Sequence, residues 1–383
     1  MAKQSNQACK VPRTWHHVFP KRRLRSFSPN AFHASTARNR PQTVQDEPDR
    51  DVLAAEAVRW WPEDFPLGFH LQDNIPQFLD EGRWREIVEG ALRQWSAIPS
   101  AEISLRLAPG LTPSPDDDGE FGDGADASDG RFTIGWLPDD AGVGPLAYAV
   151  LTWTDRLRLT SCDIVFVAGT FQQLAEAGAT PSELERTVRT TILHEVGHCL
   201  GLNHTEPAPV WQGPHPDLPG TSDVTLPVAP GFRPDTVMSY ALSRPLRLSE
   251  DDATGVSLLY PAPGFLESRG AVAGDVVRGS DPSLFAYVQA VYPGAEPRLG
   301  PGAYAGKTGH FRLSGLRPGP VLLWIHPLLI HGPVAQSVLL GDIYLASRDP
   351  DSLDIQDQWQ WVRIEAGTVV GLPASEVVTG RSQ

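Results

Sequence analysis

The stretch TILHEVGHCLGLNH, residues 191–204, constrains the fold of this chain more than any other segment does. It lies at the end of PSELERTVRTTILHEVGHCLGL, residues 181–202, which is predicted to form a long helix. Thr180 can cap that helix, and Pro181 suits its first turn. Gly201 should mark its end, because glycine adopts a positive φ without steric cost and helices commonly stop at such a residue. The sequence therefore predicts a helix that stops abruptly and a chain that turns sharply after it.

Two histidines of this stretch, His194 and His198, are spaced to hold one metal ion. Residues four apart lie one above the other on a helix, so both imidazoles project from the same face. The turn at Gly201 can swing His204 back as a third ligand, whereas an uninterrupted helix would point it elsewhere. Three histidines leave one position open on a tetrahedral zinc ion, as in catalytic zinc sites. We therefore expect one catalytic Zn²⁺ rather than ordinary polar residues near a helix end.

Glu195 directly follows the first of these three ligands. It should sit beside the metal rather than on it, within reach of a zinc-bound water. Because zinc lowers the pKa of such a water toward about 7, a carboxylate can remove its proton as a general base. The expected chemistry is hydrolysis, with Glu195 as the catalytic residue.

The composition is that of a soluble globular protein and limits the other functions open to the chain. Its 383 residues suffice for two domains, or for one large domain with a smaller one. The formal net charge of -14 argues against nucleic-acid binding, which normally requires a basic surface. No window approaches the roughly 18 apolar residues of a membrane span. The cysteines Cys9, Cys162 and Cys199 are too few for a disulfide framework, and the last two are expected to be buried thiols.

The chain divides into three parts. Residues 1–51 are expected to be a basic, disordered tail, in which no apolar core of a signal peptide follows the run KRRLRSF. After residue 264, short Val- and Leu-rich runs separated by Gly and Pro are typical of a small β-sandwich, expected over residues 266–383. Between these parts, strands are expected at 65–73, 101–107, 131–137, 146–154 and 162–168, and helices at 80–98, 181–202 and 249–260. The helix at 80–98 is predicted from the helical spacing of its apolar residues. Asp80 is a plausible cap of that helix, and Ser249 opens the last helix with a capping box.

The segment PSPDDDGEFGDGADASDG, residues 113–130, is acidic and rich in glycine. Such a composition suggests Ca²⁺, but the EF-hand pattern, with its spaced aspartates, glycine and final glutamate, is not met. A solvated surface loop is the preferred interpretation. Ca²⁺ stays an alternative that no specific motif supports.

The residues of the predicted zinc site resemble a known clan. HEVGHCLGLNH matches the H-E-x-x-H-x-x-G-x-x-H signature of the metzincin metalloproteases. That clan has a methionine-containing turn downstream, and Met238, in TVMSYAL, is the only methionine besides Met1. Within the clan, RLSEDDATGVSLLYP, residues 247–261, resembles the closing helix of matrixins. LAYAV, residues 146–150, resembles the matrixin strand on which peptide substrates pair.

This resemblance implies a fold, an activity and a location. It implies an α+β catalytic domain over residues 52–262, with a twisted, mixed five-stranded sheet, three main helices and a cleft between an edge strand and the zinc helix. The implied activity is that of a zinc metalloendopeptidase, which hydrolyses peptide bonds of a protein or peptide substrate. The substrate would add to the edge strand through backbone hydrogen bonds. Export is implied as well, so the protein is expected to be secreted.

Some residues depart from the matrixin pattern. Tyr148 stands where the typical animal matrixin strand carries a histidine for a second, structural zinc, so we expect no structural zinc. The segment between His204 and Met238 is much longer than in those matrixins and is expected to reshape the cleft. Trp211 and His215 within it are interpreted as packing or surface residues.

Two further residues have a possible role by resemblance only. Tyr240 resembles the Met-turn tyrosine of astacins and serralysins, which can approach the zinc and help to stabilise the oxyanion. The alternative for Tyr240 is a packed tyrosine. Cys9, in ACKVPR, fits only part of the PRCGxPD segment that keeps matrixins latent, so a cysteine switch is the weaker interpretation.

The C-terminal part has a resemblance of its own. TGHFRLSGLRPGPVLLWI, residues 308–325, resembles the core of carboxypeptidase regulatory-like domains, which are transthyretin-like β-sandwiches. Such modules are usually non-catalytic, which implies stabilisation or docking to a surface or substrate. An alternative function follows, a non-catalytic adhesion or binding protein that uses the zinc domain as a scaffold. Retention of Glu195 with all three ligands argues against it.

Overall fold

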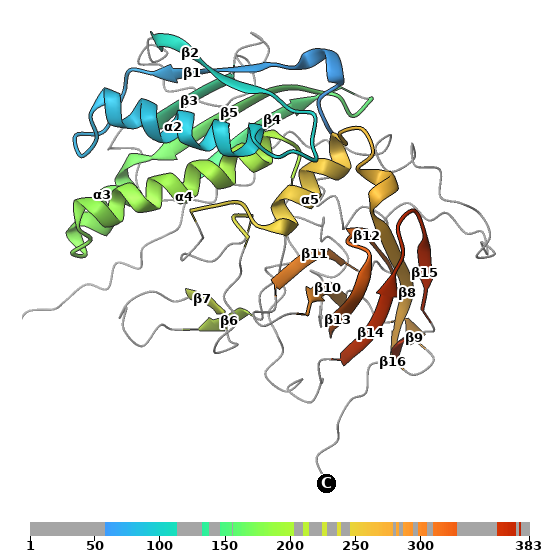
Figure 1. The fold of residues 1–383 in the computed structure, drawn as a ribbon. Coiled ribbons are helices and arrows are strands. Elements are labelled where there is room, and N and C mark those ends of the chain that lie inside the picture. The colour runs from blue at the N-terminus through green and yellow to red at the C-terminus, as the bar shows by residue number, and fades with distance from the viewer. Residues whose placement is uncertain are drawn as a thin grey trace, which may run out of the picture.

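The computed structural model describes residues 58–112, 132–137, 146–154, 156–202, 210–213, 224–227, 236–238, 246–278, 281–282, 286–293, 298–304, 309–327, 358–372 and 375–376. These residues form a mixed α+β structure, as the sequence predicts (Figure 1). Predictions for the basic tail, the acidic loop 113–130, Cys9, His204, His215 and Tyr240 fall outside the described residues. Within the described part of the chain, no helix is both long and apolar enough to cross a membrane.

The helices of the described residues are η3 (Pro62–Asp64), α2 (Glu81–Ser96), α3 (Ala168–Glu176), α4 (Pro181–Cys199), α5 (Glu250–Leu259) and η6 (Leu266–Ser268). The predicted caps are confirmed. The Asp80 side chain accepts a hydrogen bond from Arg83 N, and Thr180 and Ser249 each open a capping box. α3 is not predicted from the sequence. It begins directly after a strand, and Val167 at its N-cap offers no side-chain acceptor that would signal a start.

The N-terminal sheet contains β1 (Leu67–Gln72), β2 (Leu105–Thr112), β3 (Phe132–Leu137), β4 (Ala147–Trp153) and β5 (Leu159–Val167). Their order is β2-β1-β3-β5-β4, in which β4 runs antiparallel to β5 and the other pairs are parallel. The expected mixed, five-stranded sheet is therefore present. β2 begins later than predicted because the residues before it pair with the residues that directly follow α5. Ala101 forms a bridge with Pro261, and Glu102 N donates to Tyr260 O.

The main hydrophobic core lies between this sheet and the helices α2 and α4, which run across one of its faces (Figure 1). Its buried members all fall between residues 58 and 260. α2 contributes the six apolar positions whose helical spacing predicted it, namely Trp84, Ile87, Val88, Ala91, Leu92 and Trp95. The core thus fixes α4, which carries two of the three expected ligands, against the sheet.

A disulfide between Cys162 and Cys199 joins β5 to the last residue of α4. Both residues are buried, as predicted, but the expectation that they are thiols is wrong. They are 37 positions apart in the chain, and only the packing of α4 on the sheet brings their Cα atoms to 5.4 Å. That distance is typical of disulfide pairs, whereas a cysteine count cannot reveal which residues meet.

A short hairpin, which is not predicted from the sequence, lies within the long segment between His204 and Met238. β6 (Val210–Gly213) pairs with β7 (Val224–Pro227) in antiparallel fashion, and Trp211 stands opposite Leu226. Each strand has only four residues, so alternation of apolar and polar positions is too short to recognise there.

The C-terminal β unit, residues 270–376, consists of two further sheets. The first has the order β11-β10-β13-β14, and the second has β12-β8-β15, with β9 and β16 paired to β8. Both sheets contribute to a second buried cluster, which lies between residues 272 and 364. The strands are β8 (Gly270–Arg278), β9 (Asp281–Pro282), β10 (Ala286–Tyr292), β11 (Arg298–Tyr304), β12 (His310–Leu316), β13 (Gly319–Pro327), β14 (Gln358–Ile364), β15 (Val369–Gly371) and β16 (Ser375–Glu376).

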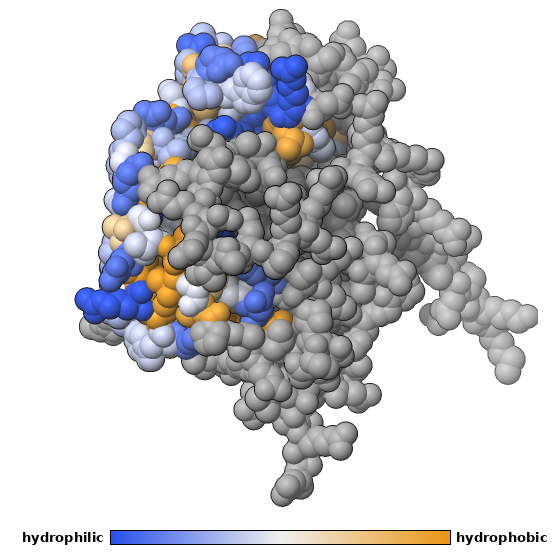
Figure 2. All heavy atoms as spheres, turned by 90° about the vertical axis from the view of Figure 1, so that its right-hand side faces the viewer, coloured by the Kyte–Doolittle hydropathy of each residue, from blue (hydrophilic) through white to orange (hydrophobic). Residues whose placement is uncertain are grey.

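The expected domain boundary, near residues 262–266, falls between the two buried clusters. α5 lies between the N-terminal layer and the C-terminal strands (Figure 1). Figure 2 views the molecule from the right-hand side of Figure 1, and hydrophobic residues gather toward the lower left of the described surface. The large hydrophobic side chains that are exposed among the described residues are Leu246, Trp361 and Val369.

Candidate metal site

The side chains of His194 and His198 converge at the C-terminal end of α4. Their Nε2 atoms lie 3.1 Å apart, and the planes of the two rings are nearly perpendicular, at 88°. His194 is 2% exposed, and His198 is partly buried. The spacing of four residues thus places the two imidazoles together, as the helical pattern predicts.

The other nitrogen of each ring is held by a backbone carbonyl. Nδ1 of His194 lies 2.7 Å from Val237 O, and Nδ1 of His198 lies 2.9 Å from Leu202 O. A carbonyl oxygen can only accept, so each Nδ1 must carry the hydrogen and donate it. In the neutral rings, both Nε2 atoms then carry a lone pair, and these lone pairs face one another.

This arrangement fits a metal ion better than it fits two neutral histidines. Two facing lone pairs repel unless a cation or a proton lies between them. Zinc–nitrogen bonds of about 2.0–2.1 Å at a tetrahedral angle place two ligand nitrogens about 3.3 Å apart. The observed 3.1 Å is close to that value. Carbonyl acceptors on the second ring nitrogen are also the usual means by which proteins orient zinc-binding histidines.

The end of α4 forms the sharp turn that the sequence predicts. Gly201 has a φ of 91°, and its N–H donates to His198 O at 2.8 Å. Leu202 N donates to Gly197 O at 3.0 Å, which completes a Schellman motif. A side chain at Gly201 would be strained and would meet Val58 O at 2.6 Å. The same turn places the Leu202 carbonyl where Nδ1 of His198 binds it.

Two aromatic side chains from distant segments hold the last carbonyl groups of α4. The Trp60 indole donates to Cys199 O at 2.7 Å, and the Tyr260 hydroxyl donates to Leu200 O at 2.8 Å. The Tyr260 hydroxyl also accepts from Trp60 N at 3.1 Å. Burial raises the pKa of Tyr260 well above its ordinary value, so the hydroxyl remains a donor. Helix carbonyls without intrahelical partners are thereby satisfied in the core.

Met238 packs against Gly197, which lies between the two histidines in the sequence of α4. A Cβ at Gly197 would lie 2.3 Å from Met238 Sδ and 3.1 Å from Trp95 Cζ2, so only glycine leaves room for the sulfur. Met238 is buried, and Trp95 Nε1 donates to Leu193 O at 3.0 Å. The glycine between the two histidines is therefore a packing requirement of the site, which sequence analysis did not assign to it.

The short segment 236–238 is held by Asp252, a residue of α5. The Asp252 carboxylate accepts from Val237 N at 3.1 Å and from Met238 N at 3.3 Å, and it bonds the Thr236 hydroxyl. It also accepts from Ser249 N at 2.7 Å. Complete burial raises the pKa of Asp252, and the hydrogen bonds from Thr236 and the backbone oppose that rise. One carboxylate thus fixes the carbonyl of Val237 that orients His194.

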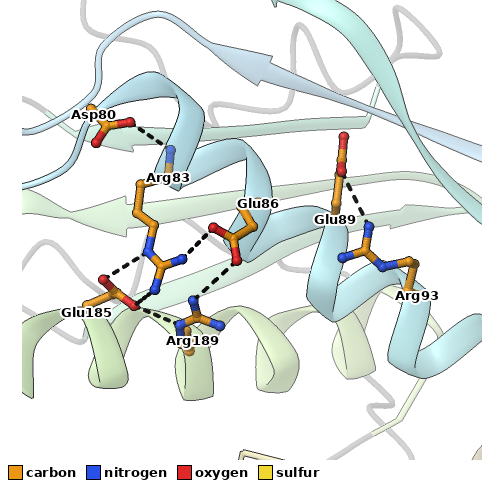
Figure 3. A network of polar contacts seen from close by, with 7 residues as sticks. All are labelled: Asp80, Arg83, Glu86, Glu89, Arg93, Glu185 and Arg189. Carbon is orange, nitrogen blue, oxygen red and sulfur yellow. Dashed lines mark hydrogen bonds and ion pairs between the residues drawn. The ribbon is translucent and has the colours of Figure 1, made fainter. Parts of the chain in front are cut away.

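The N-terminal half of α4 is joined to α2 by a network of ion pairs (Figure 3). The Arg83 guanidinium binds Glu185 through two nitrogens and also bonds Glu86. Glu185 further accepts from Arg189 Nε at 2.9 Å, and Arg189 lies 3.9 Å from Glu86. The hydrogen bond from Arg83 is the main cause of the lowered pKa of Glu185. The network stabilises the helix pair at the end remote from the histidines.

The remaining predicted site residues are placed as follows. Glu195 follows His194 on α4 and is 4% exposed. Tyr148 lies in β4 and is partly buried, which raises its pKa. His204 and Tyr240 are outside the described residues. Within the described ones, no group of three His, Cys, Asp or Glu side chains is placed to hold a metal ion.

Comparisons with known proteins add little to this geometry. No protein-family model matches the chain, and no curated protein matches its sequence. The crystal structure of wild-type OgpA from Akkermansia muciniphila aligns with 84% of this chain and 96% of that chain. The sequence identity is 13% and the TM-score is 0.22, a likeness too low to carry an argument about fold or function.

Proposed function

We propose that the protein is a zinc-dependent metalloendopeptidase that hydrolyses peptide bonds in protein substrates. The observation that carries this proposal is the pair of converging Nε2 atoms, each on a ring whose Nδ1 donates to a carbonyl. His194 and His198 would hold one Zn²⁺, with His204 as the third ligand. Zinc bound there would act as a Lewis acid toward a scissile carbonyl and lower the pKa of a water at its open position.

The chain's own residues would supply the remaining chemistry. Glu195 would act as general base and pass the proton to the leaving amine. The carbonyls of Val237 and Leu202 hold the two imidazoles in the tautomer whose Nε2 carries the lone pair that would bind the metal. β4, at one end of the sheet order, would pair with an extended peptide. Tyr240 is proposed as an additional donor to the oxyanion.

The fold proposal is a matrixin-like metzincin domain over residues 52–262. It is supported by the order of the elements, with a five-stranded sheet before α4 and with Met238 and α5 after it. The C-terminal β unit is proposed to be a transthyretin-like β-sandwich, because both of its sheets share one buried cluster. We further propose that the protein is exported. The Cys162–Cys199 disulfide supports this, since disulfides persist mainly in oxidising compartments.

Cleavage of a peptide library tests the proposed activity. The zinc-loaded protein should cleave it, a chelator should abolish cleavage, and added Zn²⁺ should restore it. Glu195→Gln should bind zinc but lower kcat at least about 100-fold, because general-base catalysis typically contributes that much or more. Glu89→Gln is the matched control, since Glu89 lies on α2 in an exposed ion pair with Arg93. Normal turnover by Glu195→Gln would refute the mechanism.

A non-catalytic binding protein is the second candidate, and the exposed Trp361 on β14 is the observation that favours it. At 61% exposure, this large aromatic side chain could contact a surface or a substrate. A zinc-loaded protein that cleaves no member of a proteome-wide library would support this candidate over the protease. Loss of attachment to a surface in Trp361→Ser, with normal unfolding behaviour, would assign the docking to the C-terminal β unit.

A further inference from the structure

Three consecutive acidic residues in the first turn of α5 have three different partners. Glu250 forms ion pairs with two arginines of the C-terminal part, Asp251 binds the backbone of β11, and Asp252 binds the segment 236–238. We propose that the C-terminal β unit is a fixed part of the support of the metal site. Glu250 and Asp251 are the positioning residues that connect it to that site. This inference rests on the proposed metal-binding role of His194 and His198.

The connection from α5 to the metal site runs through Asp252. Its carboxylate holds the N–H groups of Val237 and Met238, and Val237 O accepts from Nδ1 of His194. Met238 in turn packs against Gly197, between the two histidines. A displacement of the first turn of α5 would therefore move both the acceptor of His194 and the Met238 side chain that packs against Gly197.

The connection from α5 to the C-terminal β unit begins at Glu250. One of its oxygens lies 3.7 Å from Arg269 Nη1, and the other forms a shorter ion pair with Arg317. The Glu250 side chain is only 13% exposed, so solvent screens these pairs less than it screens surface pairs. Both arginines are held by aromatic rings, Arg269 over Phe265 at 5.4 Å and Arg317 over Tyr292 at 5.2 Å. The two guanidinium groups that pair with Glu250 are therefore also held by contacts with aromatic rings.

Asp251 provides the second link. Its Oδ1 accepts a hydrogen bond from Gly302 N of β11 at 3.1 Å, and the side chain is buried. A buried carboxyl group is costly unless it is hydrogen-bonded, so the placement of β11 stabilises Asp251 in its buried position. A backbone N–H group of the C-terminal β unit thus donates a hydrogen bond to a residue of α5.

The proximity of the three carboxylates makes their partners interdependent. Three buried carboxyl groups in one helical turn are costly unless each one is hydrogen-bonded or ion-paired. Each carboxylate must therefore have its own positive or N–H partner, and two of the three sets of partners come from the C-terminal part. Because one helical turn is rigid, loss of the partners of Glu250 or Asp251 should disturb the geometry at Asp252. We infer that the C-terminal β unit tunes metal binding and is not a freely tethered attachment.

The test measures metal affinity in the full-length protein, without using activity. Metal-free protein is titrated with Co²⁺, whose visible absorption reports its coordination, in competition with a chelator of known affinity. Glu250→Gln and Asp251→Ala should each weaken Co²⁺ binding about three- to tenfold. That is less than the roughly 10–100-fold typical of residues that contact a metal ligand directly, because these two act one step further away.

Conservative and control variants separate positioning from simple destabilisation. Asp251→Asn keeps an oxygen acceptor for Gly302 N, so it should retain most of the affinity that Asp251→Ala loses. Arg317→Gln leaves Glu250 paired with Arg269, so it should weaken Co²⁺ binding less than Glu250→Gln does. This variant tests the inference if the Glu250 and Asp251 variants fail to fold. In a double-mutant cycle, Glu250→Gln and Arg317→Gln should be non-additive. Glu89→Gln removes one carboxylate from α2, away from α5, and should bind Co²⁺ like the wild type.

The outcomes are distinct from those of the protease test. Wild-type Co²⁺ affinity and absorption in folded Glu250→Gln and Asp251→Ala would overturn the inference, even if the protein proves to be a protease. Equal losses in Asp251→Asn and Asp251→Ala would overturn the role of the hydrogen bond to Gly302. Weakened Co²⁺ binding in a protein that cleaves no peptide would support the inference while the proposed activity fails.

Discussion

Gly197 lies between the two histidines, and the absence of a side chain there allows Met238 to approach α4. The residue is thus as much a part of the site as the imidazoles are, although it has no chemistry of its own. Protein interiors are packed closely enough that one added methyl group must displace a neighbour. Substitution of Gly197 therefore tests whether the packing of Met238 supports the metal site.

Gly197→Ala should destabilise the protein by about 1–3 kcal/mol and weaken metal binding, because its Cβ would overlap Met238 Sδ. Urea unfolding and Co²⁺ titration would measure the two effects. Gly90→Ala is the matched control, since Gly90 is also helical and a Cβ there meets nothing within 4 Å. It should stabilise α2 by about 0.5–1 kcal/mol. If Gly197→Ala behaves like Gly90→Ala, the packing argument is wrong.

At the scale of elements, α4 is held at both ends by different forces. Its C-terminal end is fixed by the disulfide to β5 and by the hydrogen bonds from Trp60 and Tyr260. Its N-terminal half is held to α2 by partly exposed ion pairs (Figure 3). The tighter anchoring is therefore at the end that carries His194 and His198.

The disulfide should contribute substantially to stability. Closing a loop with a sequence separation of 37 residues restricts the unfolded chain, which corresponds to about 4 kcal/mol by chain entropy, with typical measured values of about 2–4 kcal/mol. The double variant Cys162→Ala/Cys199→Ala should lose free energy of unfolding in that range. Peptide mass spectrometry without a reductant should find the two cysteines linked. Two free thiols in the folded protein, after oxidative preparation, would contradict the pairing.

The ion-pair network should make the α2–α4 contact sensitive to acid. Glu185 has a lowered pKa in the folded protein, so its contribution to stability is present above its unfolded pKa and is lost as the pH falls through the folded pKa. Arg83→Met should lower the free energy of unfolding at neutral pH, and it should lower it less in acid, where Glu185 is protonated. Urea unfolding of the wild type and the variant, at neutral pH and at acidic pH, measures this difference in the free energy of unfolding. Arg93→Met, which removes an exposed pair, should show little pH-dependent change, and an equal effect would refute the assignment.

At the scale of the whole molecule, metal binding should be coupled to folding. The proposed ligands meet only in the folded chain, so an ion that binds them stabilises the native state. With free Zn²⁺ at about 100 times its dissociation constant, the stabilisation should be about 2.7 kcal/mol. Thermal unfolding should therefore occur at a lower temperature in the presence of a chelator. A His194→Ala/His198→Ala variant should show no such difference, and a difference of the same size would place the metal elsewhere.

Local signals in the sequence predict much of this structure. Helix caps at Asp80, Thr180 and Ser249 are local hydrogen bonds, and they are where the sequence places them. The apolar spacing of α2 and the stop at Gly201 also depend only on near neighbours in the chain. α3 and the β6–β7 hairpin are missed because they lack a side-chain cap and recognisable alternation, respectively.

The sequence by itself determined that His194 and His198 share one helix face and that the chain turns sharply after them, because four-residue spacing and a positive φ are local properties. Only the tertiary structure decided which groups surround that face. Three sets of contacts join residues that are distant in the chain. They are the disulfide between Cys162 and Cys199, the packing of Met238 against Gly197, and the bonds that Glu250, Asp251 and Asp252 make to other elements. Such contacts depend on how the elements pack, and packing is a property of the whole fold that no single segment encodes.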